Sequence, residues 1–361
     1  MVDREPHPRV LYLTTRDVAT KRTGADNRAG YLYEGLRRSI SVDLIYFDRS
    51  EEDQTHDRGT AVPYPRSELL AILSIRFLLT VIRAVRSEEY DAVVVSGIGA
   101  VTYGLVASLL ARASFVFDDH NVEVHLARGD SIPRYLVVYV LERSACALAA
   151  LVVVPTAETR TALTGWARGQ IQIVTNGYDA ETFTPDSDVV SDATPRLFYF
   201  GNYRYEPNVE AVEYIATQLC PRLDSAGVDA QIGVAGAGVE ELPRSHRESE
   251  RIQILGFVDD LPATIRAAEL VIVPLQTGSG SRLKIIESLA CGTPVVSTPI
   301  GAEGWPTDWK NLTVVELDEF AERTIELLDE ATFERSELDE YARYSWQAQA
   351  ERFAASVRST I

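Results

Sequence analysis

Residues 270–304 read LVIVPLQTGSGSRLKIIESLACGTPVVSTPIGAEG, and the order of the parts is informative. An apolar run ends at Pro274 and Leu275, a glycine-rich loop follows at 278–281, and a helical pattern begins at Arg282. A short β-rich run, a glycine turn and a helix in this order are typical of a parallel sheet covered by helices. Glycines allow the loop amides to converge, and the start of the helix favours an anion there.

The side chains after this loop carry the charges that a diphosphate and a ribose need. Arg282 and Lys284 would balance a diphosphate, and Glu287, one turn further along, could accept hydrogen bonds from two ribose hydroxyls. The same residues also fit a tight strand-to-helix turn in which Lys284 and Glu287 form a surface ion pair. At this point both interpretations stay open.

Apolar β-rich runs alternate with helical patterns along nearly the whole chain. This alternation predicts an α/β protein with two parallel sheets, and open α/β sheets bind ligands at the carboxyl ends of their strands. We therefore expect two similar halves with a ligand cleft between them. The predicted strands are residues 10–14, 42–47, 92–96, 114–117, 151–154, 171–174, 197–200, 231–235, 252–255, 270–274, 295–297 and 313–315.

The domain boundary is predicted in the segment 184–196, TPDSDVVSDATPR, which is rich in Asp, Ser, Thr and Pro and lacks a hydrophobic period. At about 150 residues per domain, 361 residues suffice for two domains with their own cores. We expect an N-terminal domain over 1–187, a C-terminal domain over 188–340, and a last helical segment, 341–361, that packs back on the N-terminal domain.

The chain carries 53 Asp and Glu against 35 Lys and Arg, which gives a formal net charge of −18. Like-charge repulsion therefore argues against binding to nucleic acid. A surface rich in carboxylates and poor in lysine is typical of a salt-rich cytoplasm, where screening weakens the repulsion. The cysteines Cys146, Cys220 and Cys291 are far apart, so they predict neither disulfides nor a cysteine metal site, which fits a reducing compartment.

Two apolar segments raise the question of membrane contact. Residues 135–154 carry Glu142 and Arg143 at their middle, so we interpret them as a helix followed by a buried strand and not as a membrane span. Residues 68–86 predict either a half-buried scaffold helix or a helix at a membrane surface. The N-terminus has no apolar signal segment, and we expect a cytoplasmic protein, with the inner face of the cell membrane as a possible site.

Four further segments share with 270–304 a resemblance to one family. In chain order they are DDHNVE, VTNGYDAETFTP, FYFGNYRYEPNVEAVEYI and LGFVDDLPATIRAAELVIVP, which begin at residues 118, 174, 198 and 255. They resemble the retaining nucleotide-sugar glycosyltransferases of family four, or group 1, which have the GT-B fold of two Rossmann-like domains facing each other across a cleft. The resemblance implies transfer of a sugar from a nucleotide-sugar donor to a glycan or lipid-linked acceptor, with retention of the anomeric configuration.

The resemblance also implies roles for single residues. Glu287 would hold the ribose, Arg282 and Lys284 the diphosphate, and the backbone at 256–258 the base. The turn around Gly24 looks like the N-terminal loop that closes on the diphosphate. The donor-binding residues implied in this way are Gly24, Gly201, Arg204, Gly256, Phe257, Val258, Ser279, Gly280, Ser281 and Glu287.

Two positions depart from the family's pattern. The family often has a second glutamate eight positions before the ribose-binding one, where this chain has Ser279. It also commonly has an arginine and a lysine after the first strand of the second domain, and here only Arg204 is present. We interpret Arg282 and Lys284 as the compensation, and the departures bear on which sugar is recognised.

His120 lies in the run FDDHNVE, directly after a predicted strand. The resemblance implies that it contacts a sugar hydroxyl or the reacting centre, and the alternative is a histidine that is only part of a capped loop. Asp118, Asp119, Glu123 and His125 could form a metal site with it. We expect neither a metal nor another cofactor, because transferases of this fold stabilise the leaving diphosphate with helix dipoles and cationic side chains.

Catalysis is therefore assigned to His120, Arg282 and Lys284. The two cations would stabilise the departing nucleoside diphosphate, which can itself take the acceptor proton on the same face, so that no protein nucleophile is required. Two other functions stay open, a nucleotide-sugar epimerase of the same fold and a catalytically silent partner that binds a sugar nucleotide. The expected partners are the donor, the acceptor and, through peripheral contact, a membrane, but not nucleic acid.

Overall fold

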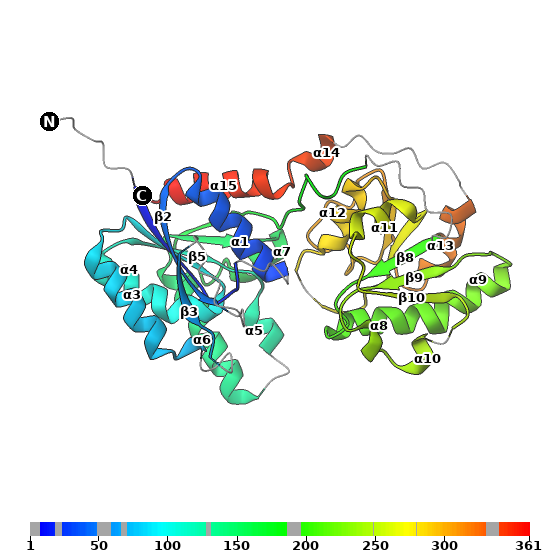
Figure 1. The fold of residues 1–361 in the computed structure, drawn as a ribbon, viewed down its shortest axis with the longest axis horizontal. Coiled ribbons are helices and arrows are strands. Elements are labelled where there is room, and N and C mark those ends of the chain that lie inside the picture. The colour runs from blue at the N-terminus through cyan, green and yellow to red at the C-terminus, as the bar shows by residue number, and fades with distance from the viewer. Residues whose placement is uncertain are drawn as a thin grey trace. The chain divides into compact units, whose positions relative to one another are not determined.

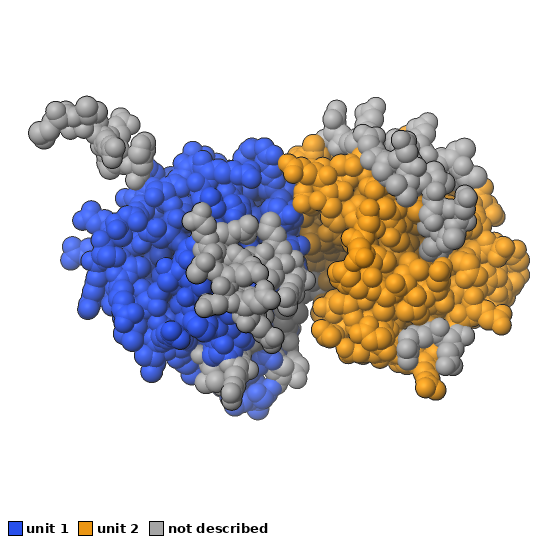
Figure 2. Space-filling model, in the orientation of Figure 1, with its two compact units in different colours: residues 1–176, 346–361 blue, residues 177–345 orange. Residues whose placement is uncertain are grey.

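The structure is a computed structural model of the 361-residue chain. Its described residues form two compact units, residues 1–176 with 346–361 and residues 177–345, which Figure 2 shows in blue and orange. Each unit is built on one parallel sheet, as the alternating patterns predicted. The described residues are 8–18, 24–48, 59–65, 71–127, 131–185, 196–247, 249–278, 280–329 and 339–361.

Unit 1 contains a seven-stranded sheet with the order β3-β2-β1-β4-β5-β6-β7, and every neighbouring pair is parallel. In chain order its elements (Figure 1) are β1 (Arg9–Thr14), α1 (Gly24–Arg37), β2 (Ser41–Asp48), β3 (Thr60–Pro63), α3 (Ile75–Ser87), β4 (Ala92–Ser96), the short 3-10 helix η1 (Ile98–Ala100), α4 (Val101–Ala111), β5 (Ser114–Asp118), α5 (Glu123–Leu126), α6 (Ile132–Leu148), β6 (Leu151–Val154), α7 (Ala157–Leu163), β7 (Gln170–Ile173) and α15 (Trp346–Arg358).

Helices cover both faces of this sheet. Val10 and Tyr12 of β1 pack with side chains of α1 and α15, whereas Leu11 and Leu13 pack with side chains of α3, α4 and α6. Successive side chains of a strand point to opposite faces, so one apolar run contributes to two cores. This explains why the central strands are continuous apolar runs and do not alternate with polar residues.

The last helix, α15, belongs to unit 1, and of the expected segment 341–361 only the part from Trp346 onward does so. Trp346 stacks on Tyr31 of α1, with ring centroids 5.0 Å apart. The two helix backbones come close at Gly35, where an added β-carbon would lie 2.1 Å from the β-carbon of Ala350. This close approach explains why a poor helix former occupies the last turn of α1.

Unit 2 contains a six-stranded parallel sheet with the order β10-β9-β8-β11-β12-β13. Its elements are β8 (Leu197–Phe200), α8 (Glu206–Tyr214), the π-helix η3 (Ile215–Leu219), α9 (Cys220–Ala226), β9 (Ile232–Ala235), the 3-10 helix η4 (Val239–Glu241), α10 (Arg244–Arg247), β10 (Ile252–Gly256), α11 (Leu261–Ala267), β11 (Leu270–Val273), α12 (Leu283–Ala290), β12 (Val295–Ser297), β13 (Leu312–Val314), α13 (Phe320–Asp329) and α14 (Asp339–Ala342).

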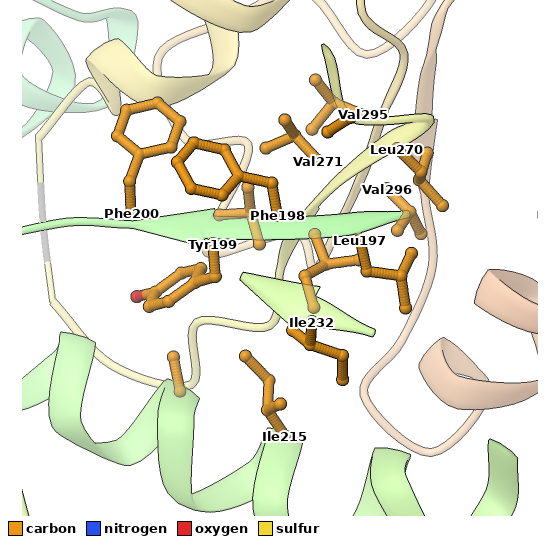
Figure 3. Close-up of a cluster of buried hydrophobic side chains, with 14 of the residues drawn as sticks. Leu197, Phe198, Tyr199, Phe200, Ile215, Ile232, Leu270, Val271, Val295 and Val296 are labelled. Atoms are coloured by element: carbon orange, nitrogen blue, oxygen red, sulfur yellow. The ribbon is translucent and has the colours of Figure 1, made fainter. Parts of the chain in front are cut away.

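The core of unit 2 surrounds its central strand β8. Figure 3 shows Phe198 and Phe200 on one face of β8 and Tyr199 on the other, toward Ile215. The rings of Phe198 and Phe200 stack with centroids 5.3 Å apart. Since β8 is buried on both faces, its carboxyl end is held firmly where the next loop begins.

All of the predicted strands are confirmed, with ends that differ by one residue at most. The structure adds β3 (Thr60–Pro63), which the sequence did not predict. It is a four-residue strand at the edge of the sheet and ends in proline, so it lacks the long apolar run by which the other strands were recognised.

The boundary between the units differs from the expected one at 187. Unit 1 ends at Asn176, because Tyr178 already joins the core of unit 2 and its N–H donates to the carbonyl of Tyr344. Most of the predicted linker, residues 186–195, lies outside the described residues. The polar segment therefore lies shortly after the point at which the chain passes from unit 1 to unit 2.

Within the described ranges, no helix combines the length and the apolar character that a membrane crossing requires. Residues 135–154 lie in α6 and β6, the helix and strand that the sequence predicted. Of the predicted helix 68–86, residues 68–70 lie outside the described part. The helix α3 begins at Ile75, capped by Ser74, whose Oγ accepts the Phe77 N–H at 3.2 Å.

Replacing Gly35 by alanine should destabilise unit 1, because the new methyl group would collide with Ala350. We expect the free energy of unfolding to fall by about 1–3 kcal/mol from overpacking, against which the better helix propensity of alanine offsets at most about 1 kcal/mol. The variant Gly165→Ala is the control, since no atom lies within 4 Å of the added methyl group. Urea unfolding measures both, and the double variant Gly35→Ala, Ala350→Gly should recover part of the loss, because it removes the closest contact. Equal stability of the two single variants would contradict the close approach.

Candidate functional site

The strand order of unit 2 changes direction between β8 and β11. From β8 the chain proceeds outward to β9 and β10 on one side, and then to β11, β12 and β13 on the other. The loops that leave the carboxyl ends of β8 and β11 therefore diverge, and open α/β sheets bind ligands at such a point. The loop 201–205 follows β8 and the loop 274–282 follows β11, so the sheet positions the predicted donor residues.

At this edge, glycines allow the backbone segments after β8, β9 and β10 to come close enough to hydrogen-bond to one another. The Gly201 N–H donates to the carbonyl of Ala235 at 3.0 Å, and the Gly236 N–H donates to the carbonyl of Gly256 at 2.8 Å. Gly236 has a φ of +134°, and an added β-carbon would lie 1.8 Å from the carbonyl oxygen of Gly201. Only glycine fits at this position, where the loops after β8 and β9 meet.

The glycine-rich loop after β11 has the backbone geometry that the sequence predicted. Gly278 and Gly280 have φ values of +104° and +85°, a region that favours glycine. The predicted donor residue Ser279 lies outside the described residues. The hydroxyl of Ser281 is buried and has no hydrogen-bond partner in the described part of the chain. Such an orphaned hydroxyl is available to a ligand, and burial without a partner costs free energy.

Lys284 lies in the first turn of α12, and its side chain reaches one residue of β8 and one of α8. The ammonium Nζ donates to Oδ1 of Asn208 at 3.0 Å and lies 4.1 Å from the centre of the Tyr199 ring. The Tyr199 hydroxyl donates to the same Oδ1 at 2.8 Å. The alternative of a simple surface ion pair with Glu287 therefore does not describe this lysine. Sequence reasoning missed Asn208 and Tyr199, because nothing in their spacing links them to α12.

The charged groups around Lys284 shift one another's pKa values. Burial and the nearby charge of Arg282 lower the pKa of Lys284 to about 7, although Glu287 opposes this. Burial raises the pKa of Glu287 to about 7, against the effect of Lys284. Arg282 is 9% exposed, and its carbonyl accepts the indole N–H of Trp305 at 2.8 Å. A diphosphate beside the cations and hydroxyls beside the carboxylate would favour the charged forms and reverse both shifts.

The segment after β10 offers a different kind of contact. Gly256 has a φ of +73°, Val258 packs on the core of unit 2, and the Phe257 ring between them is 78% exposed. An exposed phenyl ring can stack on a flat aromatic ligand such as a base. Arg204 is exposed and its Nε donates to Oε1 of Glu241 at 3.3 Å. Its ion pair is at the surface, so we assign it little stabilising effect.

In unit 1, His120 follows β5 and is part of a buried network. Its Nε2 lies 2.9 Å from Oγ of Ser96 and 3.2 Å from Oδ2 of Asp118. The Arg28 guanidinium holds Asp118 from the other side, with Nη2 2.7 Å and Nε 2.9 Å from Oδ1. Burial would raise the pKa of Asp118, but Arg28 and His120 outweigh it and lower this pKa to about 2. Burial lowers the pKa of His120, against the effect of Asp118, so its ring is neutral at pH 7.

This network leaves one atom of His120 for a ligand. The carboxylate of Asp118 can only accept, so the tautomer that donates from Nε2 makes Nδ1 an acceptor. Nδ1 has no hydrogen-bond partner among the described residues. Gly97, with a φ of +81°, lies beside the ring, where an added β-carbon would be 3.6 Å from Cε1. His120 is therefore tied to the ends of β4 and β5, and the alternative of a histidine that belongs only to its own capped loop does not describe it.

Two carboxyl groups are buried next to this histidine. Both oxygens of Glu142 accept backbone N–H groups at the start of α5, from Glu123 at 2.6 Å and from Val124 at 3.0 Å. Burial, with a contribution from Glu123, raises the pKa of Glu142 to about 7. Burial and the charges of Glu142 and Glu123 raise the pKa of Asp119 well above its usual value. Both acids therefore favour their protonated forms, and Glu142 anchors the start of α5 through its two backbone hydrogen bonds.

The remaining sequence predictions concern the N-terminal loop and a metal. Gly24 is the exposed first residue of α1, and of the predicted turn only the residue before it lies outside the described part. Across the described ranges, no three side chains of His, Cys, Asp or Glu gather where they could hold a metal ion. Asp118, one of the alternative metal ligands, is already bound by Arg28 and His120.

Comparisons with known proteins agree with this arrangement of two units. Residues 22–182 match the family described as glycosyltransferase family 4, and residues 194–330 match the family described as glycosyl transferases group 1. The chain is 28% identical over 222 residues to a D-inositol 3-phosphate glycosyltransferase of Corynebacterium jeikeium. That match spans 50% of this chain and 50% of the relative.

Solved structures resemble the chain over nearly its whole length. A sucrose-phosphate synthase from Thermosynechococcus elongatus has a TM-score of 0.75 at 16% identity, with 98% of both chains covered. The Anabaena protein HepE, solved with UDP and glucose, has a TM-score of 0.71 at 19% identity, with 98% of this chain and 100% of HepE covered. At these identities the similarity establishes the fold.

The buried carboxyl pair predicts that unit 1 loses stability as the pH rises. Glu142 and Asp119 bind protons more tightly in the folded chain than in the unfolded chain, so their contribution is present near pH 4.5 and is lost as the pH rises through about 7. Asp119→Asn removes one of the two acids, and we expect it to raise stability at pH 8 by about 1–3 kcal/mol relative to pH 5.

Urea unfolding at both pH values measures this effect. Glu89→Gln is the matched control, because Glu89 is an exposed acid of the same unit and its removal should leave the pH profile unchanged. If Asp119→Asn and wild type show parallel profiles, the pKa of Asp119 is not raised in the folded chain.

Proposed function

Because the chain belongs to the group 1 glycosyl transferases of family 4, we propose that it transfers a sugar from a nucleotide-sugar donor to a glycan or lipid-linked acceptor, with retention of the anomeric configuration. The curated relative that it matches is covered over half of its length, so the donor, the acceptor and the stereochemistry are all part of the proposal. We propose that no metal or organic cofactor takes part.

The observation that carries the proposal is the pair of like charges on α12. Arg282 and Lys284 lie close enough for the charge of Arg282 to lower the pKa of Lys284, and both have their charged ends at the diverging loops of the sheet. Two cations that lie together away from water cost free energy. Binding of a neutral ligand would not offset this cost. A diphosphate would offset this cost, with the loop amides at 278–281 and the Ser281 hydroxyl as further donors.

The donor would then be held at three points of unit 2. The diphosphate lies against Arg282 and Lys284, the ribose hydroxyls donate to Glu287, and the base stacks on Phe257. The base would also contact the backbone around Gly256. Because backbone groups are the same in most residues, side chains would contribute little to the choice of base. HepE was solved with UDP, which makes uracil the first base to test here.

The chemical step follows from this arrangement. The bond between the anomeric carbon and the diphosphate oxygen breaks, and the acceptor oxygen bonds to the same carbon from the same face. The acceptor proton passes to the departing diphosphate oxygen, whose growing charge is stabilised by Arg282 and Lys284. His120 presents a neutral ring, and its Nδ1 would accept a hydrogen bond from a hydroxyl of the transferred sugar.

We also propose that the reaction takes place in the cytoplasm, at the inner face of the cell membrane. The three cysteines are free and buried, which fits a reducing compartment. The acidic composition supports a salt-rich solution, so measurements are best made in concentrated KCl.

A panel of nucleoside diphosphates and their sugars, followed by thermal unfolding, tests the proposal. A ligand that binds the folded chain stabilises it by RT ln(1 + [L]/Kd), so one nucleotide class should raise the unfolding temperature. Product analysis with the stabilising donor then separates the functions. A transferred sugar supports the proposal, a changed sugar nucleotide without acceptor identifies an epimerase, and binding without any product identifies a silent partner.

Lys284→Met should weaken binding of the stabilising nucleoside diphosphate by about 1–3 kcal/mol, or roughly 5- to 150-fold in Kd, because it removes a charge-assisted contact. In wild type, binding should also weaken above pH 7, by up to about tenfold per pH unit, since Lys284 must then take up a proton. Titration calorimetry at pH 7 and pH 9 measures both effects, and the variant should lose the pH dependence.

Lys310→Met is the matched control, because Lys310 is an exposed lysine of the same unit outside the diverging loops. It should bind the nucleotide as wild type does. An unchanged Kd in Lys284→Met, with the control also unchanged, would contradict the assignment of Lys284.

A further inference from the structure

The side chain of Asn208, in the first turn of α8, connects the loop after β8 to the helix that follows β11. Its Nδ2 donates to the carbonyl of Asn202, in the loop after β8, at 2.8 Å. Its Oδ1 accepts the ammonium of Lys284, from α12, at 3.0 Å and the hydroxyl of Tyr199, from β8, at 2.8 Å. One buried amide therefore links both sides of the point where the strand order changes direction.

The orientation of this amide follows from its partners. The carbonyl of Asn202 can only accept, so the NH2 group of Asn208 must face it, which places Oδ1 toward Lys284. Burial raises the pKa of Tyr199 above its usual value, so its hydroxyl keeps its proton and donates to the same Oδ1. A flipped amide would set its NH2 group against an ammonium, which has no acceptor. The contact between Asn208 and Lys284 is therefore fixed by the residues around it.

Gly201 leaves the space that the side chain of Asn208 needs. A β-carbon added at Gly201 would lie 2.9 Å from Cγ and Nδ2 of Asn208 and 3.0 Å from its Oδ1. Carbon atoms in contact prefer about 3.5–4.0 Å, so the amide would have to move. Gly201 is one of the predicted donor-binding residues, and the structure gives it a steric role, which is to leave the amide of Asn208 within reach of Lys284.

Asn208 gives the ammonium of Lys284 an acceptor without a countercharge. The charged and titratable groups around this ammonium are Arg282 before α12, Glu287 on α12 and Tyr199 on β8, and from α8 the contact is the neutral amide. An ammonium has three N–H donors, and one of them donates to Asn208. A carboxylate in the same place would offset the charge of Lys284 and repel a phosphate. The neutral amide fixes the position of the ammonium and leaves its charge for a ligand.

We propose that Asn208 is a positioning residue of the donor site: its amide oxygen holds the ammonium of Lys284 at the diverging loops without neutralising it, so that the charge is available to the diphosphate of the donor. The inference rests on the proposed function and adds to it a residue that acts through Lys284. Both polar atoms of Asn208 have partners within unit 2, so it does not need to touch the donor itself.

An NMR titration of the lysines tests the contact without any ligand. The chain contains only three lysines, Lys21, Lys284 and Lys310, so a sample labelled with ¹³C at the lysine Cε gives three signals, and Lys284→Met assigns the relevant one. Asn208→Leu removes the acceptor, so the pKa of Lys284 should fall below about 7. Asn208→Asp adds a carboxylate, so this pKa should rise by about one unit or more. An unchanged pKa in both variants would overturn the positioning role.

Titration calorimetry with the nucleoside diphosphate that stabilises wild type tests the link to the donor. Both variants should bind it about tenfold more weakly at pH 7, Asn208→Leu because the ammonium is no longer held and Asn208→Asp because its carboxylate repels the diphosphate. The pH profiles should move in opposite directions. Binding to Asn208→Leu should begin to weaken at a lower pH than in wild type, whereas Asn208→Asp should lose most of the weakening between pH 7 and pH 9. Profiles parallel to that of wild type in both variants would contradict an action through Lys284.

The variants Asn311→Leu and Asn311→Asp are the matched controls. Asn311 and Asn208 are both asparagines of unit 2 that are 6% exposed, but Asn311 precedes β13 at the opposite edge of the sheet. The controls should change neither the pKa of Lys284 nor the Kd of the nucleotide. Gly201→Ala is an independent variant, because its methyl group displaces the amide, and it should act as Asn208→Leu does. If Asn208→Asp does not fold, Asn208→Leu and Gly201→Ala decide the question.

The two experiments separate this inference from the proposed function. If the pKa of Lys284 shifts as expected but no nucleoside diphosphate binds to the folded wild type, the proposed function fails, and the donor role of Asn208 fails with it. If the nucleotide binds equally well to wild type and to both Asn208 variants, the proposed function stands and the role of Asn208 is wrong.

Discussion

Both units depend on one constraint, that a parallel sheet buried on two faces gathers the carboxyl ends of all its strands at one edge. The core side chains of β8 fix the position at which the chain leaves the sheet through Gly201. Those of β4 and β5 fix the positions of Gly97 and His120 in the same way. Polar and charged groups at these ends need little structure of their own. The loops can therefore hold strained glycines and buried charges, because the strands behind them supply the stability.

The two units handle buried charge in opposite ways. In unit 1, Arg28 and Asp118 form a close buried pair, so Asp118 stays ionised and orients His120. In unit 2, Arg282 and Lys284 lie together as like charges, and burial, followed by the charge of Arg282, lowers the pKa of Lys284. A satisfied pair fixes geometry, whereas a repelling pair gains free energy when an anion arrives. This difference is why we assign positioning to the first group and diphosphate binding to the second.

The sequence predicted what depends on local pattern. Apolar runs located all strands except the short edge strand β3, and the glycines at 278 and 280 predicted a turn with positive φ before α12. It could not predict partners that folding brings from afar, such as Asn208 for Lys284 or Arg28 for Asp118, which are 76 and 90 residues away. By contact, unit 2 begins ahead of the segment that composition marked as a linker, because Tyr178 already packs in the core of unit 2.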